Sequence, residues 1–323
     1  MTAAQDMREN LEMHIIVHTP KGNEFVLPGF DVRKIDTNEI NHDSFYATPS
    51  HSSYSELLFH AGNYEMISFN VGDQEIQFMF FSGKRKIYEK FGVVDKIKDI
   101  LAFYTDTYGP LYMKDFFATT EIKRPLIILE RNNAGAYATA RENVCLINGS
   151  TLISTIFGED EIELQSIQQL AECFAGQWWS SFGHGVNVYP EEIWSESALI
   201  KYSAYLYVKD RYGAEVGNDL YPEMWKRESK RLNNSFYWRN KEYIEYLSLS
   251  QIAIIYQANW QMQEVNKMPL MLFAMQEELG ENVFLDRLQL VYETYKSEEQ
   301  MFFAEFIKTM GFDEKEYQAY VYE

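Results

Sequence analysis

The spacing of apolar residues changes once along the chain, near residue 85. Upstream of that point, short runs of β-branched and aromatic residues are bounded by Gly, Asn, Pro and Asp, a pattern typical of strands. The runs are Met13–Pro20, Asn23–Phe30, Ser55–Gly72 and Gln74–Gly83. The segment Asn70–Gln74 predicts the turn of a hairpin that joins the last two. The polar, turn-rich segment Asn38–Ser53 predicts a loop.

Downstream of residue 85 the apolar spacing becomes helical. From Tyr88 to Tyr108, apolar residues recur every three or four positions, and Gly109-Pro110 ends the predicted helix. Two strands, Pro125–Arg131 and Asn143–Asn148, predict a small sheet. Beyond residue 160 the pattern predicts helices only. These are Glu161–Trp179, Pro190–Gly213, Tyr243–Val265, Lys267–Gly280, Glu281–Lys296 and Glu298–Gly311.

These elements predict an α+β fold of two parts: a β-rich lobe at residues 1–85 and a mostly helical domain at residues 86–323. A chain of 323 residues, 46% of them hydrophobic and 16% aromatic, has ample material to bury two such cores. No apolar run approaches the roughly 20 residues that span a bilayer.

Charge and cysteine content narrow the range of partners and compartments. Asp and Glu number 48 against 29 Lys and Arg, a formal net charge of −19. This balance opposes binding to nucleic acid or to an anionic membrane, and it favours basic peptides or cations. With two cysteines and no leader-like apolar stretch at the N-terminus, we expect a cytoplasmic protein without a disulfide framework.

One stretch bears directly on function: "QQLAECFAGQWWSS", Gln168–Ser181. A Gln-Trp-Trp run closes its predicted helix. Three other stretches occur in a characteristic order around it. The stretch "ILAFYTDTYGPLYMKDF" precedes it, and "IWSESALIKYSAYL" and then "NKMPLMLFAMQEELGENVFLDRLQLVYETYK" follow it. Together they resemble the gluzincin metallopeptidases, the family of aminopeptidase N. The resemblance covers roughly residues 55–312. It implies a truncated N-terminal β lobe followed by a thermolysin-like, α-rich catalytic-type domain with a small sheet.

The resemblance also assigns the family's site residue by residue. Anchored on the Gln-Trp-Trp run, the first zinc-binding histidine falls on Glu172, the general base on Cys173 and the second histidine on Gly176. The third ligand falls on Glu196, one residue later than the usual spacing. The catalytic tyrosine falls on Val265. The segment Thr139–Asn143, "TAREN", resembles the family's amine-binding loop, and this resemblance would make Glu142 the residue that binds a substrate's N-terminus.

The residue types at these positions cannot reproduce zinc peptidase chemistry. That chemistry needs two imidazoles one helical turn apart and a carboxylate base. Gly176 offers no ligand, a thiol of ordinary pKa is mostly protonated at neutral pH, and Val265 donates no hydrogen bond. We therefore expect no zinc and no cofactor. An oxygen-ligated Mg²⁺ or Ca²⁺ on Glu172 and Glu196 stays open, although two carboxylates rarely suffice.

Two functions remain on the sequence alone. The favoured one is a pseudo-peptidase, not a zinc-dependent aminopeptidase, that binds a peptide or protein partner in the former active-site cleft. Such a ligand would be cationic or would present a free N-terminus. The alternative is a metal-independent enzyme that acts on a peptide substrate, with Cys173, Glu172, Glu196 and His184 as candidate catalytic residues. A scaffold role in a larger complex is a variant of the first. A purely structural interpretation of the same helix makes Cys173, Trp178 and Trp179 ordinary residues of the hydrophobic core.

Overall fold

The computed structural model describes residues 15–28, 30–37, 39–49, 59–113, 124–132, 138–141, 143–157, 160–179, 186, 188, 195–234, 236–298, 300–313 and 315–317. The chain divides into two compact units. Unit 1 comprises residues 1–102, 110–173 and 182–184, and unit 2 comprises residues 103–109, 174–181 and 185–323. Among the described residues, no helix is long and apolar enough to cross a bilayer.

Unit 1 begins with a three-stranded antiparallel sheet in the order β1-β4-β3. Its strands are β1 (Ile15–Pro20), β3 (Phe30–Ile35) and β4 (His42–Pro49). The prediction of a loop at Asn38–Ser53 is wrong, since β4 is the central strand. Phe45 and Ala47 of β4 are buried in a small core with Phe25 and Phe30. The short strands β2 (Glu24–Val26) and β5 (His60–Gly62) pair separately.

The main sheet of unit 1 has five strands in the order β6-β7-β8-β10-β9. They are β6 (Tyr64–Val71), β7 (Gln74–Phe81), β8 (Leu126–Arg131), β9 (Ala138–Arg141) and β10 (Val144–Asn148). The predicted hairpin at Asn70–Gln74 and the predicted pair of strands near residues 126–147 are confirmed. The strand β7 pairs with β8 in parallel. The compact units therefore do not divide at residue 85, because this pairing joins both sides of the switch in one sheet.

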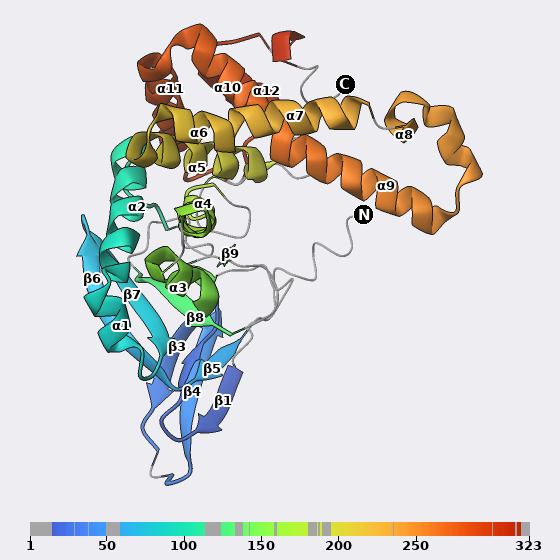
Figure 1. Ribbon diagram of the computed structural model, residues 1–323. Coiled ribbons are helices and arrows are strands. Elements are labelled where there is room, and N and C mark those ends of the chain that lie inside the picture. Colours follow the sequence, from blue (N-terminus) through green and yellow to red (C-terminus); the bar gives the residue numbers. More distant parts are fainter. Residues whose placement is uncertain are drawn as a thin grey trace. The chain divides into compact units, whose positions relative to one another are not determined.

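Four helices begin in unit 1: α1 (Arg85–Lys90), α2 (Val93–Tyr108), α3 (Gly149–Phe157) and α4 (Asp160–Ala175). The helices α1 and α2 form the crossover between β7 and β8, and they run beside β6 and β7 (Figure 1). The predicted single helix is interrupted at Gly92, whose φ of 70° lies in the left-handed region that glycine adopts without strain. From Phe103 onward, α2 belongs to unit 2, as does α4 from Phe174.

Most of the remaining described residues of unit 2 are helical. Its helices are α5 (Glu196–Tyr212), α6 (Ala214–Leu220), α7 (Pro222–Asn233), α8 (Phe236–Arg239), α9 (Leu249–Met262), α10 (Met268–Leu279), α11 (Glu281–Tyr295) and α12 (Phe303–Met310). A 3₁₀ turn, η1 (Lys241–Tyr246), precedes α9, and a π-helical turn, η2 (Gln263–Lys267), follows it. The core of this unit lies where α5 packs against α10 and η2.

Two helices that the sequence pattern separates are one continuous helix in the structure. The elements α9, η2 and α10 run without a break from Leu249 to Leu279. The sequence pattern predicts a new helix at Lys267–Gly280 with Pro269 in its first turn, where proline is tolerated although it lacks the N–H that an interior position donates. In the structure the π turn precedes Pro269, which occupies the first turn of α10, and the helix does not end there.

Candidate functional site

The C-terminal end of α4 carries three of the residues that the sequence assigned to the site. Glu172 is half-buried, Cys173 is buried, and Gly176 is buried in the turn that follows the helix. Behind them, Trp178 and Trp179 are fully buried. The indole Nε1 of Trp178 donates to the carbonyl of Gly109 at 3.1 Å, within unit 2. The Gln-Trp-Trp run thus anchors the end of this helix in the core.

The burial of Cys173 bears on its proposed role as a nucleophile. The residue is 4% exposed, and its backbone carbonyl lies 3.8 Å from the thiol of Cys145. Both cysteines are buried and reduced. A thiol in this setting behaves as a small apolar side chain, because a nucleophile must be reached by its substrate.

Glu196 lies at the start of α5. Ser195 caps the helix, and its hydroxyl accepts a hydrogen bond from the backbone N–H of Ser197 at 3.0 Å. A carboxylate in the first turn is stabilised by the positive end of the helix dipole. The cap fixes where α5 begins and so holds Glu196 at the end of the helix.

A second carboxyl group, which the sequence did not single out, joins Glu196 in unit 2. Glu264 lies in η2 and is only 7% exposed. Burial raises its pKa to about 7 from an ordinary 4.5. A hydrogen bond from the Ser195 hydroxyl lowers the pKa, and the negative charge of Glu196 raises it further. The structure therefore brings Ser195, Glu196 and Glu264 together.

Val265, the residue assigned to the tyrosine position, follows Glu264 in η2 and is half-buried. The position assigned from the family motif is therefore the direct neighbour of Glu264. The available signal was the position of Glu264, which is the first charged residue after the uncharged stretch Tyr246–Gln263. π-Helical turns occur frequently at functional sites, which adds weight to this position.

The candidate site residues assigned from the sequence lie in different compact units of the chain. Glu172 and Cys173 belong to unit 1, whereas Gly176, Glu196 and Val265 belong to unit 2. Glu142 and His184 lie outside the described residues. Within the described ranges, no group of three or more His, Cys, Asp or Glu side chains is arranged to hold a metal ion.

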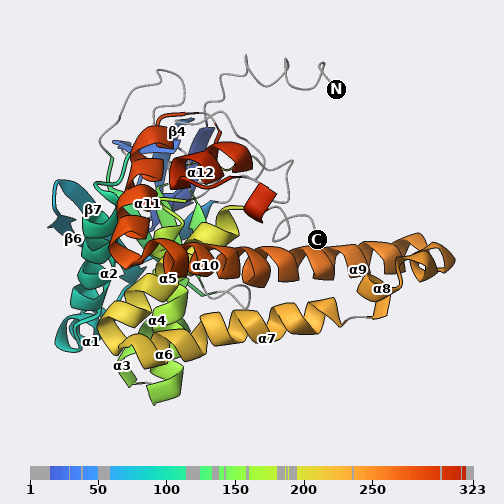
Figure 2. The ribbon, with the colours of Figure 1, turned by 90° about the horizontal axis from the view of Figure 1, so that it is seen from above.

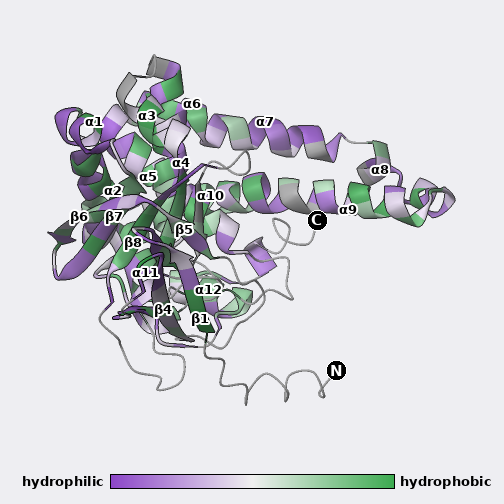
Figure 3. Cartoon of the chain, turned by 90° about the horizontal axis from the view of Figure 1, so that it is seen from below, coloured by the Kyte–Doolittle hydropathy of each residue, from purple (hydrophilic) through white to green (hydrophobic). Residues whose placement is uncertain are grey.

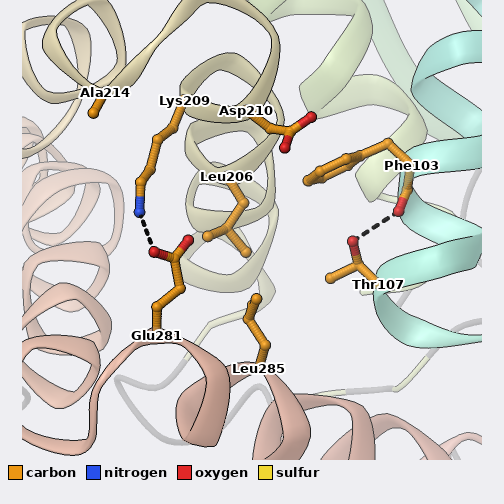
Figure 4. Close-up of a pocket in the computed structure, with 8 residues that line it drawn as sticks. All are labelled: Phe103, Thr107, Leu206, Lys209, Asp210, Ala214, Glu281 and Leu285. Carbon is orange, nitrogen blue, oxygen red and sulfur yellow. Dashed lines mark hydrogen bonds and ion pairs between the residues drawn. The ribbon is translucent and has the colours of Figure 1, made fainter.

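Unit 2 also contains a cavity of about 310 Å³ between α2, α5 and α11 (Figure 4). Two of its charged groups pair with each other, since Lys209 Nζ lies 2.7 Å from Glu281, and the Thr107 hydroxyl donates to the Phe103 carbonyl at 2.7 Å. None of the residues assigned from the sequence lines this cavity. It is a separate, open pocket in which Lys209 pairs with Glu281, and Asp210 pairs with Arg211.

Comparison with solved structures identifies the fold. The M1 zinc metallopeptidase from Deinococcus radiodurans matches 95% of this chain with a TM-score of 0.58 and 13% sequence identity. A mutant of the same enzyme bound to a Tyr-Ser-Ala substrate matches with a TM-score of 0.57. The chain shares its fold with M1 zinc metallopeptidases. It spans 62% of the length of the first of these structures.

The sequence itself is distant from known families. No protein-family model matches it, and a search of curated proteins finds no relative. The resemblance to gluzincin peptidases is confirmed at the level of fold. An identity of 13% carries no activity across, so function must be argued from the residues of this chain.

Proposed function

We propose that this protein is a peptidase-fold binding protein without zinc-dependent hydrolysis, and that it binds a cationic group of a peptide or protein at Glu196 and Glu264. The observation that supports this most is the raised pKa of Glu264, whose carboxyl group is buried next to the charge of Glu196. Two carboxyl groups in a poorly solvated site repel one another when both are ionised, and a bound cation relieves that repulsion.

An organic cation suits this site better than a metal ion. The donors are two carboxyl groups and one hydroxyl, and hard metal ions need six or more oxygen ligands. An α-ammonium or a Lys side chain needs only two or three acceptors, which Glu196 and Glu264 can supply. The formal charge of −19 also raises the local concentration of basic ligands.

The lack of hydrolysis is proposed from the residues in the positions of the family's catalytic groups. Glu172, Cys173 and Gly176 supply no imidazole, and Val265 has no hydroxyl. We therefore expect the purified protein to hold no stoichiometric zinc after dialysis against a mild chelator. We also expect no cleavage of aminoacyl-arylamide substrates. Equimolar zinc, or turnover that a Glu196→Gln substitution abolishes, would contradict this part of the proposal.

Calorimetric titration with trialanine tests the binding part directly. The tripeptide with a free N-terminus should bind at least about tenfold more tightly than its N-acetylated form, which lacks the cation. Glu196→Gln and Glu264→Gln should each weaken binding by about tenfold. Cys173→Ala is the control and should leave affinity unchanged.

Proton release distinguishes this site from any other acidic surface. A cation that binds Glu264 stabilises its ionised form, so binding near pH 6.5 should release protons. Titrations in buffers of different ionisation enthalpy measure that release. Equal binding of the acetylated peptide, or binding without proton release that Glu264→Gln leaves unchanged, would overturn the proposal.

A further inference from the structure

The helices α7 and α9 form a hairpin that extends away from the other helices of unit 2. Figures 1 and 2 show the two helices side by side, joined at their far end by α8 and η1. None of the described side chains between Lys230 and Met262 is buried. Yet this segment is rich in Tyr, Trp, Ile and Leu. Exposed apolar side chains grouped in this way mark a surface that a partner covers.

The helix α9 differs from the rest of the chain in its lack of charge. From Tyr246 to Met262 there is no Asp, Glu, Lys or Arg, whereas charged residues make up 24% of the chain. Figure 3 shows the contrast, with α9 more hydrophobic than the largely hydrophilic α7. Leu249 is 86% exposed and Tyr256 is 59% exposed. An exposed helix would ordinarily carry charged residues on its outer face.

Most of the described positions of α9 are exposed, and three of the apolar ones, Leu249, Ala253 and Tyr256, have the spacing of a helix that pairs with another helix. These three residues are separated by four and then three positions, and Ile254 is exposed beside them. This repeat of 3.5 residues is the a/d seam of a coiled coil. A second stripe, with Ile252 and Ile255, is more protected than this one. We call Leu249, Ala253 and Tyr256 the α9 seam.

We propose that a second copy of this chain covers the α9 seam, and that two α9 helices pair antiparallel about a twofold axis. In such a contact each copy presents the same surface, so charges on it would repel their own kind. An uncharged seam allows two chains of net charge −19 to meet without placing further like charges at the contact.

The charge distribution favours this occupant over others. The segment Pro222–Met262 has six basic and four acidic residues, a net +2, which leaves 23 against 44, or −21, for the rest of the chain. A helix that lies on a membrane carries Lys and Arg on its polar face, and α9 has none. A different protein that recognises a strongly acidic chain would use charge complementarity, which the seam does not offer.

The antiparallel direction follows from the same repulsion. With α9 helices paired antiparallel, the remaining helices of each unit 2 lie at opposite ends of the pair. The fourteen residues of α9 would then separate them by about 20 Å at 1.5 Å per residue. That is roughly two Debye lengths at physiological ionic strength, so most of the repulsion is screened. A stagger that places Ala253 of one copy against Tyr256 of the other fits a small side chain to a large one.

Sedimentation velocity on the full chain tests the proposal, and α9 offers a closely matched pair of variants. Ala253 and Ala258 are both exposed on α9, but only Ala253 belongs to the seam. The wild type should sediment as a dimer at about 10 µM. Ala253→Glu should weaken the dimer at least about tenfold by placing two like charges in the seam. Ala258→Glu should leave the dimer intact.

Two results would overturn the proposal. A wild-type chain that stays monomeric at up to about 100 µM has no self-association of useful strength. A dimer that survives Ala253→Glu, or that Ala258→Glu disrupts to the same extent, is formed by a different surface. Circular dichroism of both variants confirms that the helical content is unchanged. The outcome is independent of whether Glu196 and Glu264 bind a cation, because Glu264→Gln leaves the seam untouched.

Discussion

At the scale of single residues, the buried carboxylate of Glu130 shows how closely this fold constrains its backbone. Glu130 is 0% exposed in β8. Its carboxylate pairs with the ammonium of Lys84 and accepts the backbone N–H of Phe81 at 3.0 Å. Gly149, the first residue of α3, lies against the same carboxylate. A Cβ added there would overlap a carboxylate oxygen and lie 3.2 Å from the carboxyl carbon.

We predict that Gly149→Ala destabilises the protein by roughly 1–3 kcal/mol, measured by chemical denaturation. Helix propensity alone predicts the opposite, a gain of up to about 1 kcal/mol. The clash should prevail because Glu130 is held by two bonds and cannot move without losing one of them. Ser150→Ala, at the next, exposed position, should change stability by less than about 0.5 kcal/mol. A stabilised Gly149→Ala variant would show that the carboxylate moves freely.

Glu264 makes a prediction about pH. Its pKa is about 7 in the folded protein and near 4.5 when exposed, so the folded state holds more protons between these values. Stability should therefore fall as pH rises through this window, by about 1 kcal/mol between pH 6 and pH 8. Denaturation at the two pH values measures the change, and Glu264→Gln should remove that contribution. Glu242→Gln, on the exposed hairpin, should keep it.

At the scale of elements, the start of α5 links helix capping to the properties of the site. The Ser195 hydroxyl accepts from the backbone N–H of Ser197 and donates to Glu264. We predict that Ser195→Ala costs about 1 kcal/mol of stability through loss of the cap. It should also raise the pKa of Glu264 further, since the hydrogen bond that lowers it is gone.

The pH profile of stability separates the two effects of Ser195→Ala. Loss of the cap lowers stability at every pH, whereas the change at Glu264 moves the pH-dependent step to higher pH. Ser197→Ala keeps the backbone donor and should do neither. If Ser195→Ala lowers stability without moving the step, Ser195 acts as a cap and has no influence on Glu264.

At the scale of the whole molecule, the distribution of charge predicts opposite responses to salt. Pairing through the uncharged α9 seam brings together two chains of net charge −19, so salt should screen their repulsion and strengthen the dimer. Binding of a cation at Glu196 and Glu264 is an attraction between charges, so salt should weaken it. Sedimentation and calorimetry between about 50 and 500 mM NaCl measure the two trends. Trends of the same sign would contradict one of the two proposals.

The sequence by itself determined the elements that local residue patterns mark clearly. The strands β7 and β8 and the helices α2 and α5 follow from apolar runs, helical spacing and the stop signals at Gly109 and Gly213. The order of these elements, with the Gln-Trp-Trp run, also led to the M1 peptidase fold. These features depend on local patterns, which the chain carries wherever it folds.

Tertiary structure decided what local patterns cannot express. The strand β4 reads as a polar loop, and it becomes a strand because β1 and β3 pair with it on both sides. The sequence around Pro269 predicts the start of a helix, whereas in the structure α9 continues through the π-helical turn η2 into α10. The unusual titration of Glu264 depends on Ser195 and Glu196, residues about 70 positions away in the chain. Burial and charge act through space, so only the folded chain brings these groups together.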